Sequence, residues 1–386
     1  MKYLQKIVVE IDAKTHRYDV AVGAGILRST GRFITDSCGV ELRRIAVISN
    51  KKVFGLYGEA VVREIETAGV SPMIFLMKDG ERHKNFRSLQ QVLEFLSESK
   101  LARTDAVVAL GGGVVGDLAG FAASVYLRGV AFLQVPTTML AMIDSSVGGK
   151  TGVNTEFGKN LIGAFYQPKG VLIDAATLAT LPKRELTAGF CEAIKQGAIS
   201  GMPLFGKTQE FLEKYPINKG KFSDADAKFV DNLCDLLASQ IAFKASVVKL
   251  DERESAANVQ PTSRKILNFG HTFAHALERA TDYKYLKHGE AVGWGIIFAA
   301  EISKKLGLLD AEVVNLLRGV VHRAGDLPRI ENIDPAAVAA AITYDKKNIS
   351  GELQWVLLNG IGKPAIIPHS QIGDRLVRQT ITQFLH

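Results

Sequence analysis

The sequence has few cysteines and lacks an uninterrupted apolar stretch of membrane-spanning length. Its three cysteines, Cys38, Cys191 and Cys234, are spaced neither as a disulfide framework nor as a zinc knuckle, so we expect reduced, buried thiols. The longest apolar region, 106–127, contains Asp117 and five glycines, which excludes a membrane span. The first twelve residues alternate like a strand and lack the apolar core of a signal peptide. A cytoplasmic location is therefore expected.

The charge of the chain is basic, but its distribution does not suit nucleic acid. The 47 lysines and arginines outnumber the 40 acidic residues and give a net charge of +7. They are spread along the chain and form no stripe with interleaved aromatic residues. Several lysines lie in glycine-rich and histidine-rich segments, where the field of a cleft would attract phosphate or carboxylate. We expect a small anionic ligand, and neither nucleic acid nor membrane as a partner.

Two sequence patterns divide the chain near Leu181. Residues 1–181 alternate short β-rich runs with amphipathic segments, which predicts an α/β domain with a mostly parallel, Rossmann-like sheet. Residues 182–386 have helical periodicity and predict a mainly α-helical domain, with the active site in the cleft between the two. The expected strands lie at 6–11, 18–22, 44–49, 73–77, 106–110 and 131–135. The expected helices lie at 55–68, 85–99, 116–126, 183–200, 224–248, 274–279, 291–306, 310–324, 335–344 and 372–384.

A glycine-rich turn follows the expected strand at 106–110. Gly111, Gly113 and Gly116 satisfy the G-x-G-x-x-G spacing. Glycines at such a turn let backbone N–H groups approach a pyrophosphate at a helix N-terminus, although a turn that only packs tightly has the same composition. The acidic residue that usually binds ribose about twenty residues later is missing. Three polar residues elsewhere are candidates for that contact: Asn50, Glu81 and Lys84.

The segment 135–163 is dense in glycine and polar residues, yet its flanks are apolar. This combination predicts a binding loop held on a rigid scaffold. Thr137 and Thr138 are suited to hydrogen bonds with a nucleotide. The candidates for binding a polyhydroxylated anion are Asp144, Lys150, Lys159 and Asn160.

Three of the eight histidines lie within eighteen residues. His271 and His275, four apart, share one face of an expected helix, and His288 follows in an expected His-Gly-Glu turn. Three neutral imidazoles can bind one metal ion, whereas separate core histidines would explain the same residues without a metal. Glu192 and Lys195 share a face of an otherwise apolar helix, either as a surface ion pair or as a buried carboxylate that needs a cation. One Glu with two His is a common zinc ligand set.

Seven segments follow one another along most of the chain. They read GGGVVGDLAGFAASVYLRG, VPTTMLAMIDSSVGGKTGVN, GKNLIGAFYQP, LPKRELTAGFCEAIKQG, DERE, RKILNFGHTFAHALE and HGEAVGWG. Together they resemble the 3-dehydroquinate synthase family of sugar phosphate cyclases. The resemblance implies that the keto-acid phosphate DAHP is converted to 3-dehydroquinate by oxidation, phosphate elimination, reduction, ring opening and aldol closure. It also implies NAD, one divalent metal (Zn²⁺ or Co²⁺) and a homodimer.

The resemblance also implies roles for individual residues. Glu192, His271 and His288 would be the metal ligands, and His275 would move the hydroxyl proton. The substrate would be surrounded by Asp144, Lys150, Asn160, Lys195, Lys244, Arg264, Asn268 and Lys346, with Arg128 reaching the phosphate pocket of the neighbouring subunit. The NAD positions would be Asn50, Glu81, Lys84, Gly111, Gly112, Gly113, Val114, Asp117, Thr137, Thr138, Lys159, Thr177, Thr180, Leu181 and Glu185.

The chain departs from the family pattern in three places. The link at 255–263 is longer than usual, the segment around Glu192 reads CEAIKQG where AEVIKYG is common, and Asn50 replaces a common Asp. In addition, Lys347 stands beside Lys346 and competes for its role. Three other functions fit parts of the pattern. They are a sister cyclase that makes valiolone-type or deoxyinosose rings, a metal-dependent polyol dehydrogenase and a non-catalytic binding protein.

Overall fold

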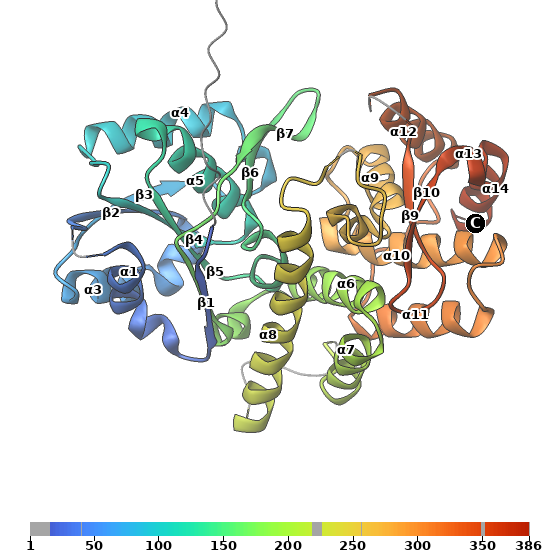
Figure 1. The fold of residues 1–386 in the computed structure, drawn as a ribbon, viewed down its shortest axis with the longest axis horizontal. Coiled ribbons are helices and arrows are strands. Elements are labelled where there is room, and N and C mark those ends of the chain that lie inside the picture. Colours follow the sequence, from blue (N-terminus) through green and yellow to red (C-terminus); the bar gives the residue numbers. More distant parts are fainter. Residues whose placement is uncertain (1–15, 40, 218–225, 256, 349–351, 386) are drawn as a thin grey trace, which may run out of the picture.

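A six-stranded sheet forms the centre of the N-terminal half of the chain (Figure 1). The computed structural model describes residues 16–39, 41–217, 226–255, 257–348 and 352–385. The strand order is β1-β8-β5-β4-β2-β3 and every neighbouring pair is parallel, which confirms the predicted sheet. The expected strand at 6–11 lies outside the described residues. The strands are β1 (Asp19–Gly23), β2 (Arg44–Asn50), β3 (Ser71–Met77), β4 (Ala106–Gly111), β5 (Ala131–Pro136) and β8 (Gly170–Asp174).

Helices cover both faces of this sheet because alternate strand residues point to opposite sides. In β2, Ala46 and Ile48 pack against α4 and α5, whereas Ile45 and Val47 pack against α1 and α3. Burying each aliphatic side chain of this kind stabilises the fold by about 1.5–3 kcal/mol. The helices of this half are α1 (Thr30–Cys38), α2 (Lys51–Val53), α3 (Glu59–Thr67), α4 (Phe86–Glu98) and α5 (Gly113–Val125).

The segment 135–163 is not the predicted loop. It contains a π-helical turn, Ala141–Ser145, and an antiparallel hairpin of β6 (Lys150–Thr155) and β7 (Gly158–Phe165). The glycines that suggested a loop instead let the two strands approach closely, since a Cβ on Gly163 would lie 1.9 Å from the carbonyl oxygen of Thr151. The polar candidates of this segment are therefore carried by a paired hairpin.

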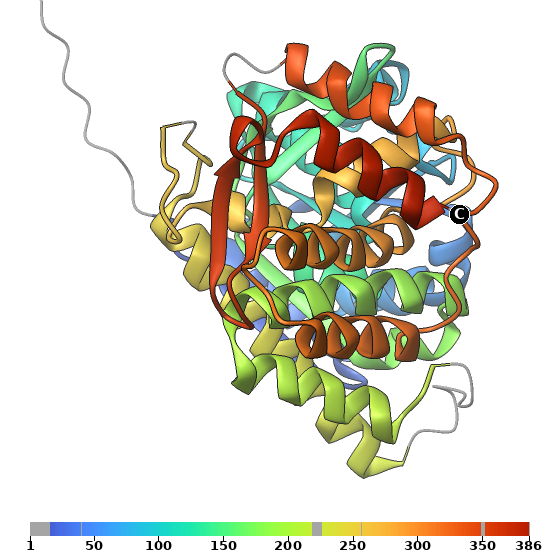
Figure 2. The ribbon, with the colours of Figure 1, turned by 90° about the vertical axis from the view of Figure 1, so that its right-hand side faces the viewer.

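The C-terminal half is mainly helical, as predicted (Figure 1). Figure 2 shows α10 alongside α6 and α11, and α10 also packs against α9. Residues on all sides of α10 are buried, which marks it as the central helix of this half. The helices are α6 (Lys183–Ser200), α7 (Met202–Lys214), α8 (Ala227–Leu250), α9 (His271–Ala280), α10 (His288–Lys305), α11 (Ala311–Arg323), α12 (Pro335–Asn348), α13 (His369–Ile372) and α14 (Asp374–Leu385).

The helical pattern of this half did not predict one antiparallel hairpin, formed by β9 (Gln354–Leu358) and β10 (Pro364–Pro368). Strand β9 packs against α10, so its pairing is supported by the core of the C-terminal half. The sequence analysis also missed α1, α7 and β8. The type of these elements is decided by the neighbours against which they pack.

The cysteines are free, as expected. Cys191 is buried, whereas Cys38 and Cys234 are only half-buried. Burial raises the pKa of the Cys38 thiol to about 11.

None of the helices in the described part of the chain combines the length and the apolarity that a membrane span requires.

Three side chains in hydrogen-bonding contact join the β9–β10 hairpin to α14. Trp355 Nε1 donates to His369 Nδ1 at 3.0 Å, and His369 Nε2 lies 2.7 Å from Asp374 Oδ1. Trp355 and His369 are buried, whereas the Asp374 side chain is largely exposed. The imidazole therefore provides the acceptor for a buried indole N–H.

We predict that His369→Phe lowers the free energy of unfolding by about 1–3 kcal/mol, because it leaves the indole donor buried without a partner. Urea unfolding of the variant and the wild type would measure the loss. The double variant with Trp355→Phe should recover part of it, since the unpaired donor is then removed. Additive losses in the double variant would contradict this explanation.

Candidate active site

Three helices bring one carboxylate and three imidazoles together. Glu192 lies within α6, His271 is the first residue of α9 and His288 is the first residue of α10. The Nε2 atoms of His271 and His288 lie 3.7 and 3.6 Å from Glu192 Oε1. His275 is one turn further along α9, and the three imidazoles each offer a nitrogen within 4.8 Å of the others. The expected His-Gly-Glu turn is wrong, because His288 begins a helix.

The approach of α10 to α6 depends on a glycine and on an ion pair whose carboxylate is buried. A Cβ on Gly289 would lie 2.0 Å from the carbonyl oxygen of Ala188, so only glycine allows this contact. Glu290 accepts from the backbone N–H of Lys287 at 2.7 Å, and it also accepts two bonds from Arg184 at 2.7 and 2.6 Å. The first turn of α10, which carries His288, is thereby fixed against the beginning of α6.

The carboxylate of Glu192 is fully buried and suited to a cation. Its relative exposure is 0%, and Oε1 has no hydrogen-bond donor among the described residues. Lys195 Nζ lies 2.5 Å from Oε2 as an ion pair and is itself buried, which rules out the surface ion pair. Oxygen Oε1 faces the two imidazoles instead. A carboxylate oxygen and two imidazole nitrogens turned toward one point fit a divalent metal ion.

The three imidazoles are in different electrostatic surroundings. Burial, with Lys195 nearby, lowers the pKa of His271 well below its usual value. His275 is exposed to solvent, yet the protein around it and His288 lower its pKa to about 4. Burial would also lower the pKa of His288, but the carboxylates of Glu278 and Glu192 outweigh it and raise that pKa. His275 is therefore neutral near pH 7 and able to accept a proton.

Glu278 was missed by the sequence analysis. Its Oε2 lies 2.9 Å from His288 Nδ1, and its Oε1 accepts from Lys159 Nζ at 2.8 Å. The signal was present, because Glu278 lies seven residues after His271 and three after His275, on the same face of α9. Its partners, however, come from other elements and cannot be read from that spacing.

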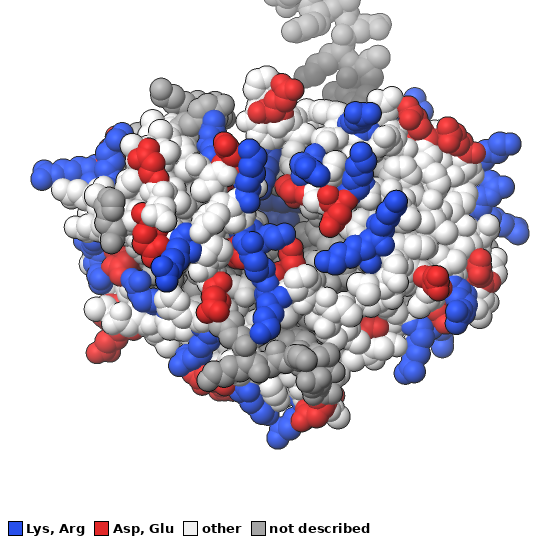
Figure 3. Space-filling model, turned by 180° about the vertical axis from the view of Figure 1, so that it is seen from behind, with Lys and Arg blue, Asp and Glu red and all other residues white. Residues whose placement is uncertain are grey.

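The residues expected around the substrate form ion pairs across the two halves of the chain. Lys244 on α8 donates to Asp144 Oδ1 at 2.6 Å and also to its backbone oxygen. Burial lowers the pKa of Lys244 to about 8, although Asp144 opposes this shift. Burial would raise the pKa of Asp144, but Lys244 and Lys195 hold it below its usual value. Figure 3 shows lysine and arginine side chains around a hollow near the centre of one face.

A second group of these residues is assembled by Glu254, which the sequence analysis quoted only within a motif. Lys150 on β6 pairs with Glu254, and Asn268 Nδ2 donates to the same carboxylate at 2.9 Å. Glu254 is therefore a shared partner for two residues expected at the substrate. Asn160 on β7 is instead drawn toward Lys84, whose Nζ donates to it at 2.6 Å.

Arg264 follows the long link at 255–263 and is held by several hydrogen bonds. Asp251 accepts from the Ser263 hydroxyl and from the Arg264 backbone N–H, both at 3.0 Å, and so closes the base of the link. The Arg264 guanidinium is buried and donates to the backbone oxygens of Gly148 and Glu252 at 2.9 and 2.6 Å. Arg264 therefore lies beside the β6–β7 hairpin.

The residues expected at NAD lie near the carboxyl ends of the parallel strands, where such sheets bind ligands. Gly112 is the N-cap of α5. Its backbone packs closely against Thr138, because a Cβ added to Gly112 would lie 3.0 Å from the Thr138 side chain. Lys84 Nζ donates to Asp117 Oδ2 at 2.8 Å. The glycine turn with free helix N–H groups and adjacent polar side chains fits a dinucleotide.

The remaining NAD candidates lie on both sides of that turn. Glu81 accepts from Asn154 at 2.7 Å, and the Tyr57 hydroxyl contacts both Thr180 Oγ1, at 2.5 Å, and the Thr177 carbonyl, at 3.0 Å. Asn50 caps α2 through Val53 N–H and donates to Asp79 Oδ1 at 3.2 Å. The Asn50 amide is thus occupied, and Asp79 brings a carboxylate to the same place. The other positions by their elements are Gly111 on β4, Gly113 and Val114 on α5, Thr137 after β5, Leu181 before α6 and Glu185 on α6.

Two expected substrate residues are not brought to the cluster by the described structure. Arg128 is exposed just beyond the far end of α5, a helix about 20 Å long that begins at Gly113. The side chain of Lys346 lies outside the described residues, as does that of Lys347, so the choice between them stays open.

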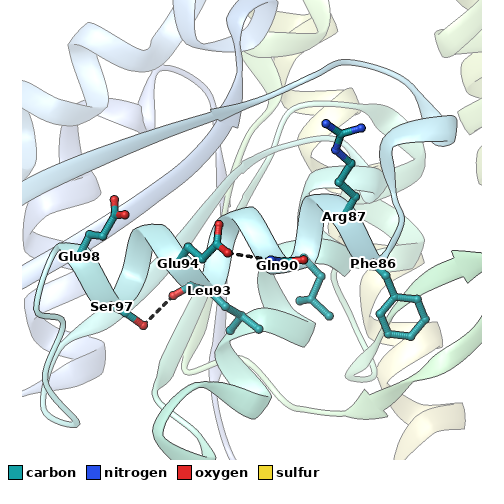
Figure 4. Close-up of a pocket in the computed structure, with 8 residues that line it drawn as sticks. Phe86, Arg87, Gln90, Leu93, Glu94, Ser97 and Glu98 are labelled. Atoms are coloured by element: carbon teal, nitrogen blue, oxygen red, sulfur yellow. Dashed lines mark hydrogen bonds between the residues drawn. The ribbon is translucent and has the colours of Figure 1, made fainter.

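A surface groove of about 700 Å³ lies elsewhere, along α4 (Figure 4). Its lining includes Phe86, Leu93 and Glu94, and Glu94 accepts a hydrogen bond from Gln90. None of the predicted site residues lines this groove. It is therefore separate from the carboxylate–histidine cluster.

We predict that, in metal-free protein, His275 titrates below the usual pKa of histidine and His288 above it. NMR titration of the imidazole signals would measure both. Neutral His275 should persist on acidification to about pH 4, whereas His288 should keep its proton above about pH 6.5. The reverse order would show that the pairing of His288 with Glu278 is absent in solution.

Comparison with known proteins identifies the family of this chain. A family model described as "3-dehydroquinate synthase N-terminal" matches residues 74–188, and one described as "3-dehydroquinate synthase C-terminal" matches residues 189–348. The chain is 40% identical to a 3-dehydroquinate synthase of Thermodesulfovibrio yellowstonii over 367 residues, or 94% of this chain and 96% of that protein. It is 38% identical to one of Synechococcus sp. over 381 residues, or 98% of each.

Solved structures of sister enzymes have the same fold. A 2-deoxy-scyllo-inosose synthase in complex with carbaglucose-6-phosphate, NAD⁺ and Co²⁺ aligns with a TM-score of 0.79 at 27% identity, covering 94% of this chain and 96% of that one. The 2-epi-5-epi-valiolone synthase ValA of Streptomyces hygroscopicus subsp. jinggangensis 5008, with NAD⁺ and Zn²⁺ bound, aligns with a TM-score of 0.83 at 24% identity, covering 98% and 99%. The two family models and the full-length relatives show that the chain belongs to the 3-dehydroquinate synthase family.

Proposed function

We propose that this protein is a 3-dehydroquinate synthase, a phosphorus–oxygen lyase that converts DAHP to 3-dehydroquinate and phosphate with NAD and one divalent metal. The observation that carries the proposal is the buried Glu192 carboxylate, whose Oε1 has no hydrogen-bond donor among the described residues and faces His271 and His288. Full-length relatives of that name at 38–40% identity favour this reaction over those of the sister cyclases. Two similar solved structures contain NAD⁺ with Co²⁺ or Zn²⁺, which supports the same cofactors.

Glu192, His271 and His288 are the proposed metal ligands. A divalent ion bound there would act as a Lewis acid toward a substrate hydroxyl, and NAD would accept the hydride. His275 lies one turn from His271, is exposed to solvent and is neutral near pH 7. It is therefore placed to take the hydroxyl proton. The alternative ligand set, His271, His275 and His288, would leave the buried Glu192 carboxylate with Lys195 as its single charged partner.

The proposed substrate residues would neutralise the two anionic groups of DAHP. Lys150, Lys244 and Arg264 come from the hairpin, α8 and the link before α9, and all three are oriented by acidic side chains or backbone oxygens. Pre-arranged cations of this kind favour the leaving phosphate without a large reorganisation. Asp144, Asn160, Lys195, Asn268 and Lys346 complete the proposed set. Once the neighbouring carbon is oxidised, phosphate would leave with one of its own oxygens as the base.

The glycine turn after β4 is the proposed NAD pyrophosphate site. Its backbone N–H groups begin α5, and Gly112 leaves the space that a close backbone approach requires. Lys159 on β7 and the residues around Glu81 would contact the rest of the dinucleotide.

We also propose the domain boundary near Leu181, giving domains 1–181 and 182–386, because α6 begins directly after it.

A homodimer is part of the proposal. Arg128 is too far from the glycine turn of its own chain to serve the same site, which supports a contribution to the neighbouring subunit. Leu127 beside Arg128 is exposed, and so are apolar side chains of the β6–β7 hairpin, where Phe157 is 79% and Leu161 63% exposed. Burying such side chains between two copies would stabilise a dimer. A cytoplasmic location stays a prediction.

We predict that the protein releases phosphate from DAHP with no net change in absorbance at 340 nm, because NADH formed in the first step is consumed later. Removing the metal with a chelator should abolish release, and adding Zn²⁺ or Co²⁺ should restore it. Accumulating NADH would instead support a polyol dehydrogenase. Phosphate release that is unaffected by metal removal would contradict the proposed mechanism.

We predict that His271→Ala and Lys150→Ala separate metal binding from substrate binding. His271→Ala removes a ligand and should abolish bound metal and activity. Lys150→Ala should keep the metal and raise KM by about 100-fold, since one cation opposite an anionic group is lost. Metal content by mass spectrometry and steady-state kinetics would measure the two effects. Loss of metal from Lys150→Ala would show that these roles are wrongly assigned.

A further inference from the structure

Glu278 is a buried carboxylate with two cationic partners from different parts of the chain. Its relative exposure is 2%, and it lies on α9. Its Oε2 lies 2.9 Å from His288 Nδ1 on α10, and its Oε1 accepts from Lys159 Nζ on β7 at 2.8 Å. Burial of a carboxylate is costly unless such partners compensate it. Packing alone therefore does not explain why a carboxylate lies at residue 278.

The contact at Nδ1 decides what the other ring nitrogen of His288 can do. When Nδ1 carries the proton and donates it to Glu278, the lone pair of Nε2 is free. That Nε2 is the atom 3.6 Å from Glu192 Oε1. A carboxylate that accepts from Nδ1 also makes Nε2 a stronger base, and such outer partners commonly tune metal ligands.

The second proposed histidine ligand is arranged in a related way. His271 Nδ1 lies 3.3 Å from the backbone oxygen of Phe269, so both rings have an oxygen at Nδ1 and turn Nε2 toward Glu192. Helix α9 thus supplies His271 directly. Seven residues later, on the same face, it supplies the carboxylate that orients His288.

We propose that Glu278 is a positioning residue that fixes the Nδ1–H tautomer and the ring orientation of His288, and that it ties this metal ligand to Lys159 on the β6–β7 hairpin. The inference rests on the proposed metal site. Lys159 is held a second time, because its Nζ lies 4.5 Å from the centre of the Tyr283 ring. The hairpin of the N-terminal half and a metal ligand of the C-terminal half therefore share one carboxylate.

The test is Glu278→Gln, which keeps the size of the side chain and removes its charge. Zn²⁺ affinity of the metal-free protein, measured by competition with a chromogenic chelator, should fall about 10–100-fold. The matched control is Glu301→Gln on α10, which removes a carboxylate paired with Lys304 and Arg318 and should leave Zn²⁺ affinity unchanged. Wild-type affinity in Glu278→Gln, or an equal loss in Glu301→Gln, would overturn the proposal.

A second readout needs no metal. Nitrogen-15 spectra of metal-free protein at pH 9 should place the His288 proton on Nδ1, and Glu278→Gln should shift population toward Nε2–H, the form that neutral histidine prefers in water. An unchanged tautomer in the variant would overturn the orienting role. If the wild type bound no Zn²⁺, the proposed function would fail, while this spectrum would still decide the part played by Glu278.

Two further variants separate orientation from folding and from the hairpin. Glu278→Asp keeps the negative charge, but its shorter side chain moves the carboxylate away from His288. This variant should fold and should have a Zn²⁺ affinity between those of the wild type and Glu278→Gln. Lys159→Met leaves the contact between Glu278 and His288 intact. Its Zn²⁺ affinity should therefore stay within about threefold of wild type, a smaller loss than that expected when a partner of a metal ligand is removed. A loss in Lys159→Met as large as that in Glu278→Gln would overturn direct positioning by Glu278.

Discussion

A buried carboxylate with one oxygen that lacks a hydrogen-bond donor is the constraint on which the rest of this site depends. Glu192 is removed from water inside α6, and a charge in that position must be compensated. Lys195 compensates one oxygen, while the other faces two imidazole nitrogens at 3.6 and 3.7 Å. A divalent metal is the partner that such an arrangement suits, and it accounts for histidines that would otherwise have no reason to converge.

Much of the fold can be understood as support for that convergence. The close packing at Gly289 and the Arg184–Glu290 pair fix the beginning of α10 against α6. The β6–β7 hairpin reaches from the N-terminal half to α9 and to Glu254, so it brings Lys150 and Lys159 to the same region. The parallel sheet contributes its carboxyl ends, where dinucleotides bind. In the proposed site, each half supplies part of the residues.

Local sequence predicted the parts whose signal is periodic. The alternating strands, the glycine turn after β4 and the paired histidines of α9 follow from spacings of two, three and four residues. Glu192 was singled out because a carboxylate is unusual on an apolar helical face. Spacing could not show that Glu278 meets His288, that Glu254 meets Lys150 or that α10 begins at His288. Those facts depend on contacts between distant segments, as does the β9–β10 hairpin, which is supported by packing on α10.

The most direct test of this account is a crystal structure of the Zn²⁺-loaded protein with anomalous diffraction data. The account predicts one zinc peak about 2.0–2.2 Å from Glu192 Oε1 and from the Nε2 atoms of His271 and His288, with His275 uncoordinated. A zinc ion held by His271, His275 and His288, with Glu192 still paired to Lys195 alone, would contradict it.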